Sequence, residues 1–172
     1  MAGDHDAVYP DSRETRVEPK IFENGGYIFG CGGSIRMSQL LQYKFEPPCY
    51  PWSDSDMTPH RFMCTKFVDA MRSCFATNGF TNTSSILVGF DDQLFIIECD
   101  FNVGSFPDGL TAIGDGKPWA IGSLMTWKRY ADDSVDVKDA LQYAVHMSSL
   151  YSHRVGPGKV TILNTKGNKG NK

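Results

Sequence analysis

The order in which strand-like and helix-like segments follow one another constrains the fold of this chain more than any single motif does. Alternating and helical spacings of apolar residues predict the order strand, strand, helix, helix, strand, strand, strand, helix, helix, strand. Helices that occur in consecutive pairs do not alternate with strands, as they would in a doubly wound parallel sheet. The order therefore favours an α+β fold in which antiparallel sheets are covered by helices in a layered arrangement.

The predicted elements begin and end at residues with known turn and cap preferences. Residues 23–26, Glu-Asn-Gly-Gly, should join the first two strands into a hairpin, because glycine adopts positive φ at little cost. Ser34 and Thr58 are the expected N-caps of the first two helices, and Pro59 suits the first helical position. The predicted strands cover residues 15–22, 27–31, 86–90, 94–99, 110–113 and 159–163, and the predicted helices cover residues 35–45, 59–77, 118–130 and 134–151.

Length and composition indicate one domain. A chain of 172 residues, of which 41% are hydrophobic, is long enough to bury a core of its own. No internal repeat or linker divides it, so we expect a single domain over residues 1–163. Residues 164–172 read NTKGNKGNK and contain no apolar side chain, which predicts a disordered polar tail.

Charge and cysteine usage narrow the class of protein. The net charge of -3 argues against nucleic acid as the main partner, because duplex-binding proteins normally carry a basic face. The five cysteines are odd in number and irregularly spaced, and no signal-peptide pattern precedes them, which favours reduced thiols. No apolar run approaches the roughly 20 residues that cross a bilayer. We therefore expect a cytoplasmic protein with neither a nucleic-acid nor a membrane partner.

Several short motifs occur in the order and at the spacing found in proteasome β subunits and the HslV peptidase. They are GD at 3–4, PKIF at 19–22, GCGGS at 30–34, IGDG at 113–116 and GPGKVTIL at 156–163. Through these motifs the chain resembles that family over nearly its whole length. The resemblance implies a four-layer αββα sandwich of the N-terminal nucleophile hydrolase type. It also implies a homo-oligomeric ring that cuts unfolded polypeptide, with an AAA+ unfoldase as a candidate partner and without a cofactor or a metal.

The resemblance also assigns roles to three residues. The family's nucleophile is a threonine at the very N-terminus of the mature chain, whose own α-amino group accepts the hydroxyl proton. Lys20 matches the lysine that lowers the cost of forming the alkoxide, Asp4 the aspartate that holds this lysine, and Gly33 the backbone N–H that stabilises the oxyanion. Read without the family, Lys20 is an exposed lysine at a strand end, Asp4 a turn residue and Gly33 the start of a helix.

The strand that carries the threonine in the family would precede Met1. Either a longer product supplies this threonine, or the nucleophile has been lost. Asp115 replaces a small hydroxyl residue of the family, and Val155 falls, with Ser152, where the family has polar support. Read without the family, Asp115 is simply the N-cap of a helix. These departures keep two alternatives open, a catalytically inactive ring or shell subunit and a monomeric binding module.

Other chemistries fit the sequence less well. Residues 114–117 lack the remaining positions of a phosphate-binding loop, and residues 30–35 do not complete a dinucleotide fingerprint. His60 and Cys64 lie one helical turn apart and could share a zinc ion with Cys49, but no fourth ligand is apparent, so Cys64 is expected to be packed. Cys31 is interpreted as a core thiol of a strand rather than as a nucleophile.

Overall fold

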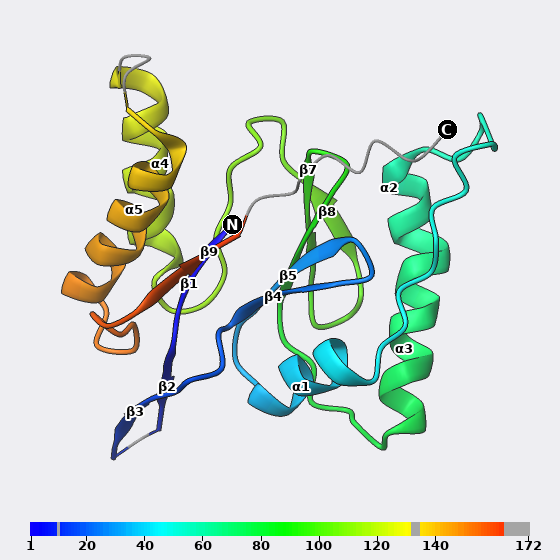
Figure 1. Ribbon diagram of the computed structural model, residues 1–172, viewed down its shortest axis with the longest axis horizontal. Coiled ribbons are helices and arrows are strands. Elements are labelled where there is room, and N and C mark those ends of the chain that lie inside the picture. The colour runs from blue at the N-terminus through cyan, green and yellow to red at the C-terminus, as the bar shows by residue number, and fades with distance from the viewer. Residues whose placement is uncertain (10, 132–134, 164–172) are drawn as a thin grey trace.

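The molecule is built of four layers, in the order helices, small sheet, large sheet, helices (Figure 1). The computed structural model describes residues 1–9, 11–131 and 135–163. One outer layer holds α4 (Lys117–Tyr130) and α5 (Val137–Tyr151), and the other holds α1 (Ile35–Tyr43) and a long helix that begins at Pro59. The predicted αββα sandwich is confirmed. The predicted tail, residues 164–172, lies outside the described residues.

The large sheet is antiparallel throughout and follows chain order. It consists of β4 (Ile21–Asn24), β5 (Tyr27–Cys31), β6 (Ile86–Phe90), β7 (Gln93–Ile97) and β8 (Val103–Ser105). Gly25 and Gly26 have positive φ in the turn between β4 and β5, which confirms the predicted hairpin. Asp91 and Asp92 adopt the same left-handed conformation between β6 and β7, where short polar side chains tolerate it.

The small sheet joins the two ends of the described chain. β1 (Ala2–Asp4) pairs antiparallel with β9 (Val160–Ile162), so that Ala2 faces Ile162 and Asp4 faces Val160. β2 (Asp6–Val8) and β3 (Arg13–Thr15) form a separate short hairpin beyond the end of β1. Figure 1 places β1 and β9 between the α4–α5 layer and the large sheet. The antiparallel sheet that completes the sandwich is therefore made from opposite ends of the sequence.

The long helix of the second outer layer contains a π-helical turn. α2 (Pro59–Phe62) continues through the π turn η1 (Met63–Phe67) into α3 (Val68–Thr77). Phe62 and Phe67 are five residues apart, yet both are fully buried. In a regular α-helix residues five apart are about 500° apart around the axis and do not share a face, so the wider turn brings both rings to the core.

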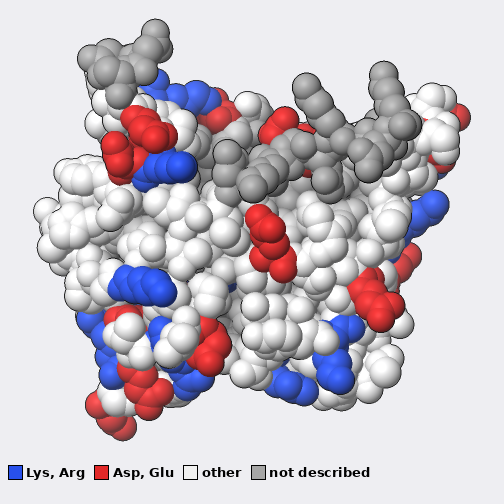
Figure 2. Space-filling view, in the orientation of Figure 1, with Lys and Arg blue, Asp and Glu red and all other residues white. Residues whose placement is uncertain are grey.

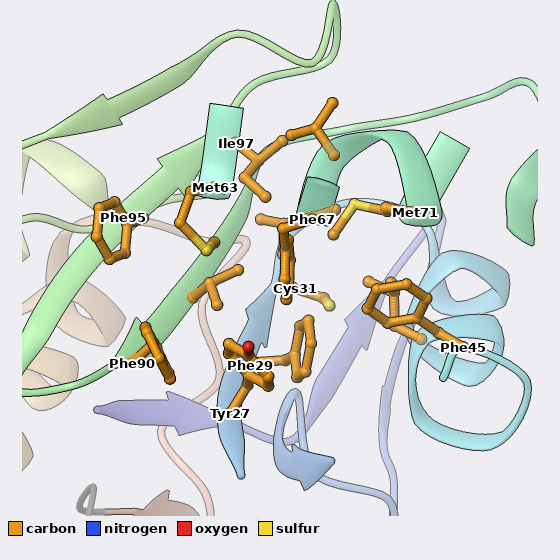
Figure 3. Packing of buried hydrophobic residues seen from close by; sticks show 14 of the residues in the cluster. Tyr27, Phe29, Cys31, Phe45, Met63, Phe67, Met71, Phe90, Phe95 and Ile97 are labelled. Carbon is orange, nitrogen blue, oxygen red and sulfur yellow. The ribbon is translucent and has the colours of Figure 1, made fainter. Parts of the chain in front are cut away.

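The main core lies between the large sheet and the α1 and α2–α3 layer. It is mostly aromatic: the Phe29 ring stacks at 6.2 Å from Phe67, and Phe45 meets Phe67 edge-on at 5.5 Å. Figure 3 shows these rings with methionine side chains from the long helix, Met63 and Met71, filling the space around them. Aromatic pairs in such geometries contribute about 0.5–1.5 kcal/mol beyond their buried area.

The core on the other side of the sandwich is small. α4 and α5 pack against each other through Leu124, Ala140 and Ala144, and Leu110 and Trp127 pack at the edge of this cluster. Small side chains allow the two helices to approach closely, but they remove little apolar surface from water.

Within the described residues, no helix is long and apolar enough to span a bilayer.

Two strand predictions are wrong. The predicted strand 15–22 is divided, because β3 ends at Thr15 and β4 begins at Ile21, with Val17 exposed between them and Pro19 unable to donate to a ladder. Residues 110–113 form no strand, and β8 occupies the edge of the large sheet instead. Leu110 lies in a loop, and its apolar side chain is partly buried against the α4–α5 cluster.

Candidate active site

Asp4 and Lys20 form an ion pair that connects the two sheets. The Lys20 ammonium Nζ donates a hydrogen bond to Asp4 Oδ1 at 2.6 Å, across 16 residues of sequence. Asp4 is the last residue of β1, and Lys20 directly precedes β4. The Asp4 side chain is 12% exposed and the Lys20 side chain is 36% exposed, so the ion pair is only partly shielded from solvent.

Backbone hydrogen bonds hold both members of the pair. The N–H of Cys31 donates to the carbonyl of Lys20 at 3.0 Å, which extends the β4–β5 ladder by one residue. The N–H of Asp6 donates to the same Asp4 oxygen that Lys20 contacts, at 2.8 Å. The lysine is therefore held by the large sheet and the carboxylate by the turn after β1, which fixes the direction of the ion pair.

Gly33 lies in the turn between β5 and α1. Its φ is +73°, and a Cβ atom at this position would lie 2.8 Å from Ser84 Oγ. Ser84 Oγ in turn donates to the carbonyl of Gly32 at 2.5 Å, which keeps the turn in place. Only glycine satisfies both the backbone conformation and the close approach. Ser34 caps α1 by accepting a hydrogen bond from the N–H of Met37, three residues later, so Gly33 lies at the electropositive end of that helix.

The three residues line one cavity between the two sheets. It has a volume of about 1370 Å³, and Asp4, Lys20 and Gly33 all contribute to its wall. Its apolar wall includes Ile28 and Leu87 on the inner face of the large sheet. The cavity wall therefore includes a polar part, made of the ion pair and the N-terminus of α1, and an apolar part, made of aliphatic side chains of the large sheet.

His5 is a buried polar residue that the sequence analysis did not single out. Its Nδ1 lies 3.1 Å from the carbonyl of Arg16, and its Nε2 lies 2.7 Å from Thr161 Oγ1. A carbonyl can only accept, so Nδ1 donates, and in the neutral ring Nε2 accepts from the threonine hydroxyl. The ring therefore ties the segment beside Asp4 to β9 and to the chain leading toward Lys20. The sequence shows that His5 lies between two aspartates, but nothing in the sequence indicates that its ring is buried.

Asp6 is buried equally deeply. Its carboxylate lies 3.8 Å from Arg13 Nε and directly against the backbone of Gly156, where a Cβ atom would be 1.9 Å from Asp6 Oδ2. Among the described residues Asp6 Oδ1 has no hydrogen-bond partner. Asp6 and Gly156 therefore form a close contact that fixes the loop before β9 against β2.

Asp115 and Val155 also line the cavity, on the α4–α5 side. Asp115 is exposed and pairs with Arg154 at 3.8 Å; α4 begins after Gly116 without a side-chain cap, so the N-cap interpretation of Asp115 is wrong. Val155 is buried, and its N–H donates to the carbonyl of Ser152 at 3.1 Å. The α4–α5 side of the cavity therefore includes, among its other lining residues, one exposed carboxylate paired with Arg154 and one aliphatic group.

The cysteines occupy different environments. Cys31 is buried in β5, and burial raises the pKa of its thiol to about 12, which confirms the interpretation as a core thiol. Cys64 is exposed and contacts His60, so the expectation that it is packed is wrong. Within the described chain, no group of three or more histidine, cysteine or acidic residues is arranged to hold a metal ion, so the suggested zinc site with Cys49 does not form in a single chain.

The arrangement suits one kind of chemistry in particular. An ammonium group held by a carboxylate stabilises negative charge on an oxygen placed beside it, and it cannot turn away because the carboxylate fixes its direction. Backbone N–H groups at a helix N-terminus stabilise a second negative oxygen nearby. A hydroxyl nucleophile and the oxyanion of an acyl intermediate are two such oxygens. The site therefore has two of the elements needed for acyl transfer.

Comparisons with known proteins support the fold. No family model matches the sequence, and no curated protein matches it significantly. Solved structures do match: BPH from Thiobacillus denitrificans in complex with epoxomicin shares 19% identity with a TM-score of 0.74, covering 93% of this chain and 88% of that one. HslV from Trypanosoma brucei shares 15% identity with a TM-score of 0.62, covering 93% and 90%.

A third match has the same architecture. Anbu, an ancestral β-subunit from Yersinia bercovieri, shares 15% identity with a TM-score of 0.57, covering 92% of this chain and 73% of that one. The chain therefore has the proteasome-like fold of the N-terminal nucleophile hydrolases, which confirms the resemblance at the level of the fold.

Proposed function

We propose that this chain is a subunit of a proteasome-like peptidase that uses an N-terminal threonine as its nucleophile. The observation that carries the proposal is the 2.6 Å ion pair between Lys20 and Asp4, set in the wall of the cavity that Gly33 also lines. The fold match supports it, because it agrees with the family motifs on which the proposed roles of these residues rest. The threonine would be supplied by a strand that precedes Met1 in a longer product.

The edge of β1 offers a place for such a strand. In the described chain β1 has β9 as its one partner, on one side, so its other edge has backbone groups available for a further antiparallel strand. A strand that turns back along β1 would bring its first residue toward the cavity beside Lys20. The proposed roles follow from this placement.

In the proposed reaction the α-amino group of the threonine takes the proton from its own hydroxyl, and the alkoxide attacks the peptide carbonyl. The Lys20 ammonium stabilises the alkoxide, and Asp4 keeps the ammonium directed at it. The N–H of Gly33 donates to the oxyanion of the tetrahedral intermediate, which then collapses as the amine leaves with the proton. Removing one such electrostatic stabiliser lowers turnover by roughly 10²–10³-fold.

The proposal includes the surroundings of the subunit. Ring assembly would enclose the cavity, and unfolded polypeptide, delivered by an AAA+ unfoldase, is the proposed substrate in a cytoplasmic setting. Acidic and basic side chains are interspersed over the face shown in Figure 2, which fits a protein that does not select a polyanion.

A second candidate function is a non-catalytic subunit of the same ring. Asp115 and Val155 favour it, because a carboxylate paired with Arg154 and an aliphatic side chain stand at the positions where the family has a small hydroxyl residue and polar support. In that case the ion pair would serve only to join the two sheets.

The test uses the longest in-frame product that contains this chain and measures hydrolysis of fluorogenic peptides with and without a threonine-directed epoxyketone. We expect turnover that the epoxyketone abolishes, and a loss of roughly 10²–10³-fold in kcat for Lys20→Ala. Lys66→Ala is the matched control, because Lys66 is an exposed lysine on η1. Because the Lys20–Asp4 pair is partly exposed, Lys20→Ala should lower the free energy of unfolding by only about 1 kcal/mol or less.

One outcome would overturn the peptidase proposal, and a second would overturn the role of Lys20 in it. An assembled product without epoxyketone-sensitive turnover would favour the non-catalytic subunit. Turnover that survives Lys20→Ala would remove Lys20 from the site.

A further inference from the structure

One peptide group connects the proposed oxyanion donor to a side chain outside the cavity wall. The N–H of Gly33 and the carbonyl of Gly32 belong to the same planar trans peptide, so they point in opposite directions. The Ser84 hydroxyl donates a hydrogen bond to that carbonyl at 2.5 Å. Both glycines line the cavity, whereas Ser84 does not. Ser84 therefore holds the end of the peptide that lies opposite the N–H.

The N–H of Gly33 is available to a ligand. Gly33 is exposed, and among the hydrogen bonds of the described residues none is donated by this N–H. The N–H of Gly32, in contrast, donates to a backbone carbonyl just before β6 at 3.3 Å, which extends the β5–β6 ladder. That ladder bond fixes the preceding peptide. Within the described chain, the bond from Ser84 is therefore the hydrogen bond that fixes the peptide between Gly32 and Gly33.

Glycine on both sides makes the orientation of this peptide easy to change. Turning the peptide over alters ψ of Gly32 and φ of Gly33, and glycine adopts φ of either sign at little cost. Gly32 does not have a positive φ, and a Cβ atom there would make only ordinary contacts, with Ile113 and Gly114 at 3.6 Å or more. Neither packing nor a positive φ therefore explains glycine at position 32, whereas rotation of the peptide would.

We propose that Ser84 is a positioning residue for the oxyanion donor, because its hydroxyl selects the peptide orientation in which the Gly33 N–H faces the cavity. In the reverse orientation the Gly32 carbonyl would face the cavity, and its partial negative charge would oppose an oxyanion. The main core holds Ser84 itself: it lies two residues before β6, and its hydroxyl is 3.7 Å from the sulfur of the fully buried Met37. The inference rests on the proposed peptidase function.

The kinetic experiment uses the same in-frame product as the peptidase test. We expect Ser84→Ala to lower kcat by roughly 3- to 10-fold, the change that loss of one neutral hydrogen bond produces in the populations of two orientations. The KM for the peptide should change by less than about twofold, because the oxyanion exists only after attack. Affinity for a peptide boronate, which forms a tetrahedral anion, should fall by the same factor as kcat. A merely structural role would not separate kcat from KM in this way.

Two variants decide whether the hydroxyl is responsible. Ser84→Thr keeps a hydroxyl at this position and should restore kcat to near the parent value. Ser85→Ala is the matched control, because the neighbouring Ser85 hydroxyl donates to the Glu98 carboxylate instead of the glycine turn, and its kcat should equal that of the parent. A change of less than about twofold in kcat for Ser84→Ala would overturn the proposal. A Ser84→Thr variant no better than Ser84→Ala would assign the effect to packing and would also overturn it.

Crystal structures of the full chain and of its Ser84→Ala variant separate this inference from the peptidase proposal, because they require no activity. We expect the Gly32 carbonyl to face Ser84 in the parent and to face the cavity in most copies of the variant. The same single orientation in both would overturn the role of Ser84. If Lys20→Ala abolishes turnover while Ser84→Ala leaves it unchanged, this inference fails and the peptidase proposal stands. If the parent product is inactive, the peptidase proposal fails, and the two structures still decide whether Ser84 orients the peptide.

Discussion

The two halves of the sandwich differ in how they are held together. The half that contains the large sheet, α1 and α2–α3 encloses a continuous core of phenylalanine, methionine and aliphatic side chains. In the half that contains β1, β9, α4 and α5, the core cluster of the described residues has three buried members, Leu124 and two alanines. Buried apolar area provides most of the favourable free energy of folding, so the large-sheet half should supply most of the stability.

The cavity lies between these halves, and the ion pair of the candidate site joins one residue from each half. Lys20 is fixed to the large sheet and Asp4 to the small one. A rigid half next to a weakly packed half suits the proposed function of this site, since local opening, which would admit a substrate, occurs where few apolar contacts are buried. Three substitutions can break or sharpen this comparison.

The largest effect is expected for Phe67→Ala in the large-sheet half. The Phe67 ring is fully buried and contacts the rings of Tyr27, Phe29 and Phe45. Its removal should lower the free energy of unfolding by about 3–5 kcal/mol, measured by urea denaturation. A decrease of less than about 2 kcal/mol, below the range for buried phenylalanines, would show that the aromatic core does not dominate stability.

Leu124→Ala tests the other half. Leu124 is buried between α4 and α5, but it also lines the cavity, so its neighbours can relax into the space left behind. We expect a decrease of about 2–3 kcal/mol, the lower part of the range for buried leucines, in the same urea experiment. If Leu124→Ala proved as costly as Phe67→Ala, the proposed difference between the halves would have to be abandoned.

The smallest effect is expected for Gly122→Ala, and it should be stabilising. Gly122 lies within α4, and a Cβ atom there would meet no heavy atom within 4 Å. Alanine in a helix interior is favoured over glycine by about 0.8–1.0 kcal/mol, so the thermal midpoint should rise.

Gly116→Ala is the matched control for that change. Its Cβ would lie 2.8 Å from atoms of Ser148 and Val155, so this variant should be destabilised. A fall in the midpoint for Gly122→Ala would show that α4 does not tolerate a side chain on that face.

Local signals predicted the elements that local interactions determine. The glycines at 25–26, the Ser34 cap and the Thr58–Pro59 start act within a few residues, and all occur as expected. The pairing of β1 with β9 could not be predicted in this way, because it joins residues about 160 positions apart and depends on the assembled layers. The strand predicted from the apolar residues at 110–113 is wrong for the same reason. Leu110 packs on α4 and α5, and this contact depends on the assembled layers.

The candidate site shows the same division. Nothing in the local sequence places Asp4 beside Lys20, and only the order of family motifs suggested it. The burial of His5 and Asp6 had no local signal either, because a polar run next to a glycine is typical of an exposed turn. Their environment is created by β9 and the loop before it, which arrive from the far end of the chain.

The π turn between α2 and α3 has a consequence for how this chain should be aligned with others of its fold. Inserting one residue into an α-helix rotates everything after it by about 100°, which would turn Met71 and Phe75 away from the sheet. A π turn absorbs one extra residue without that rotation, so it keeps the faces before and after it in phase. A length difference of one residue relative to a homologue with a regular helix therefore belongs at 63–67, inside the helix, rather than in the loops at either end.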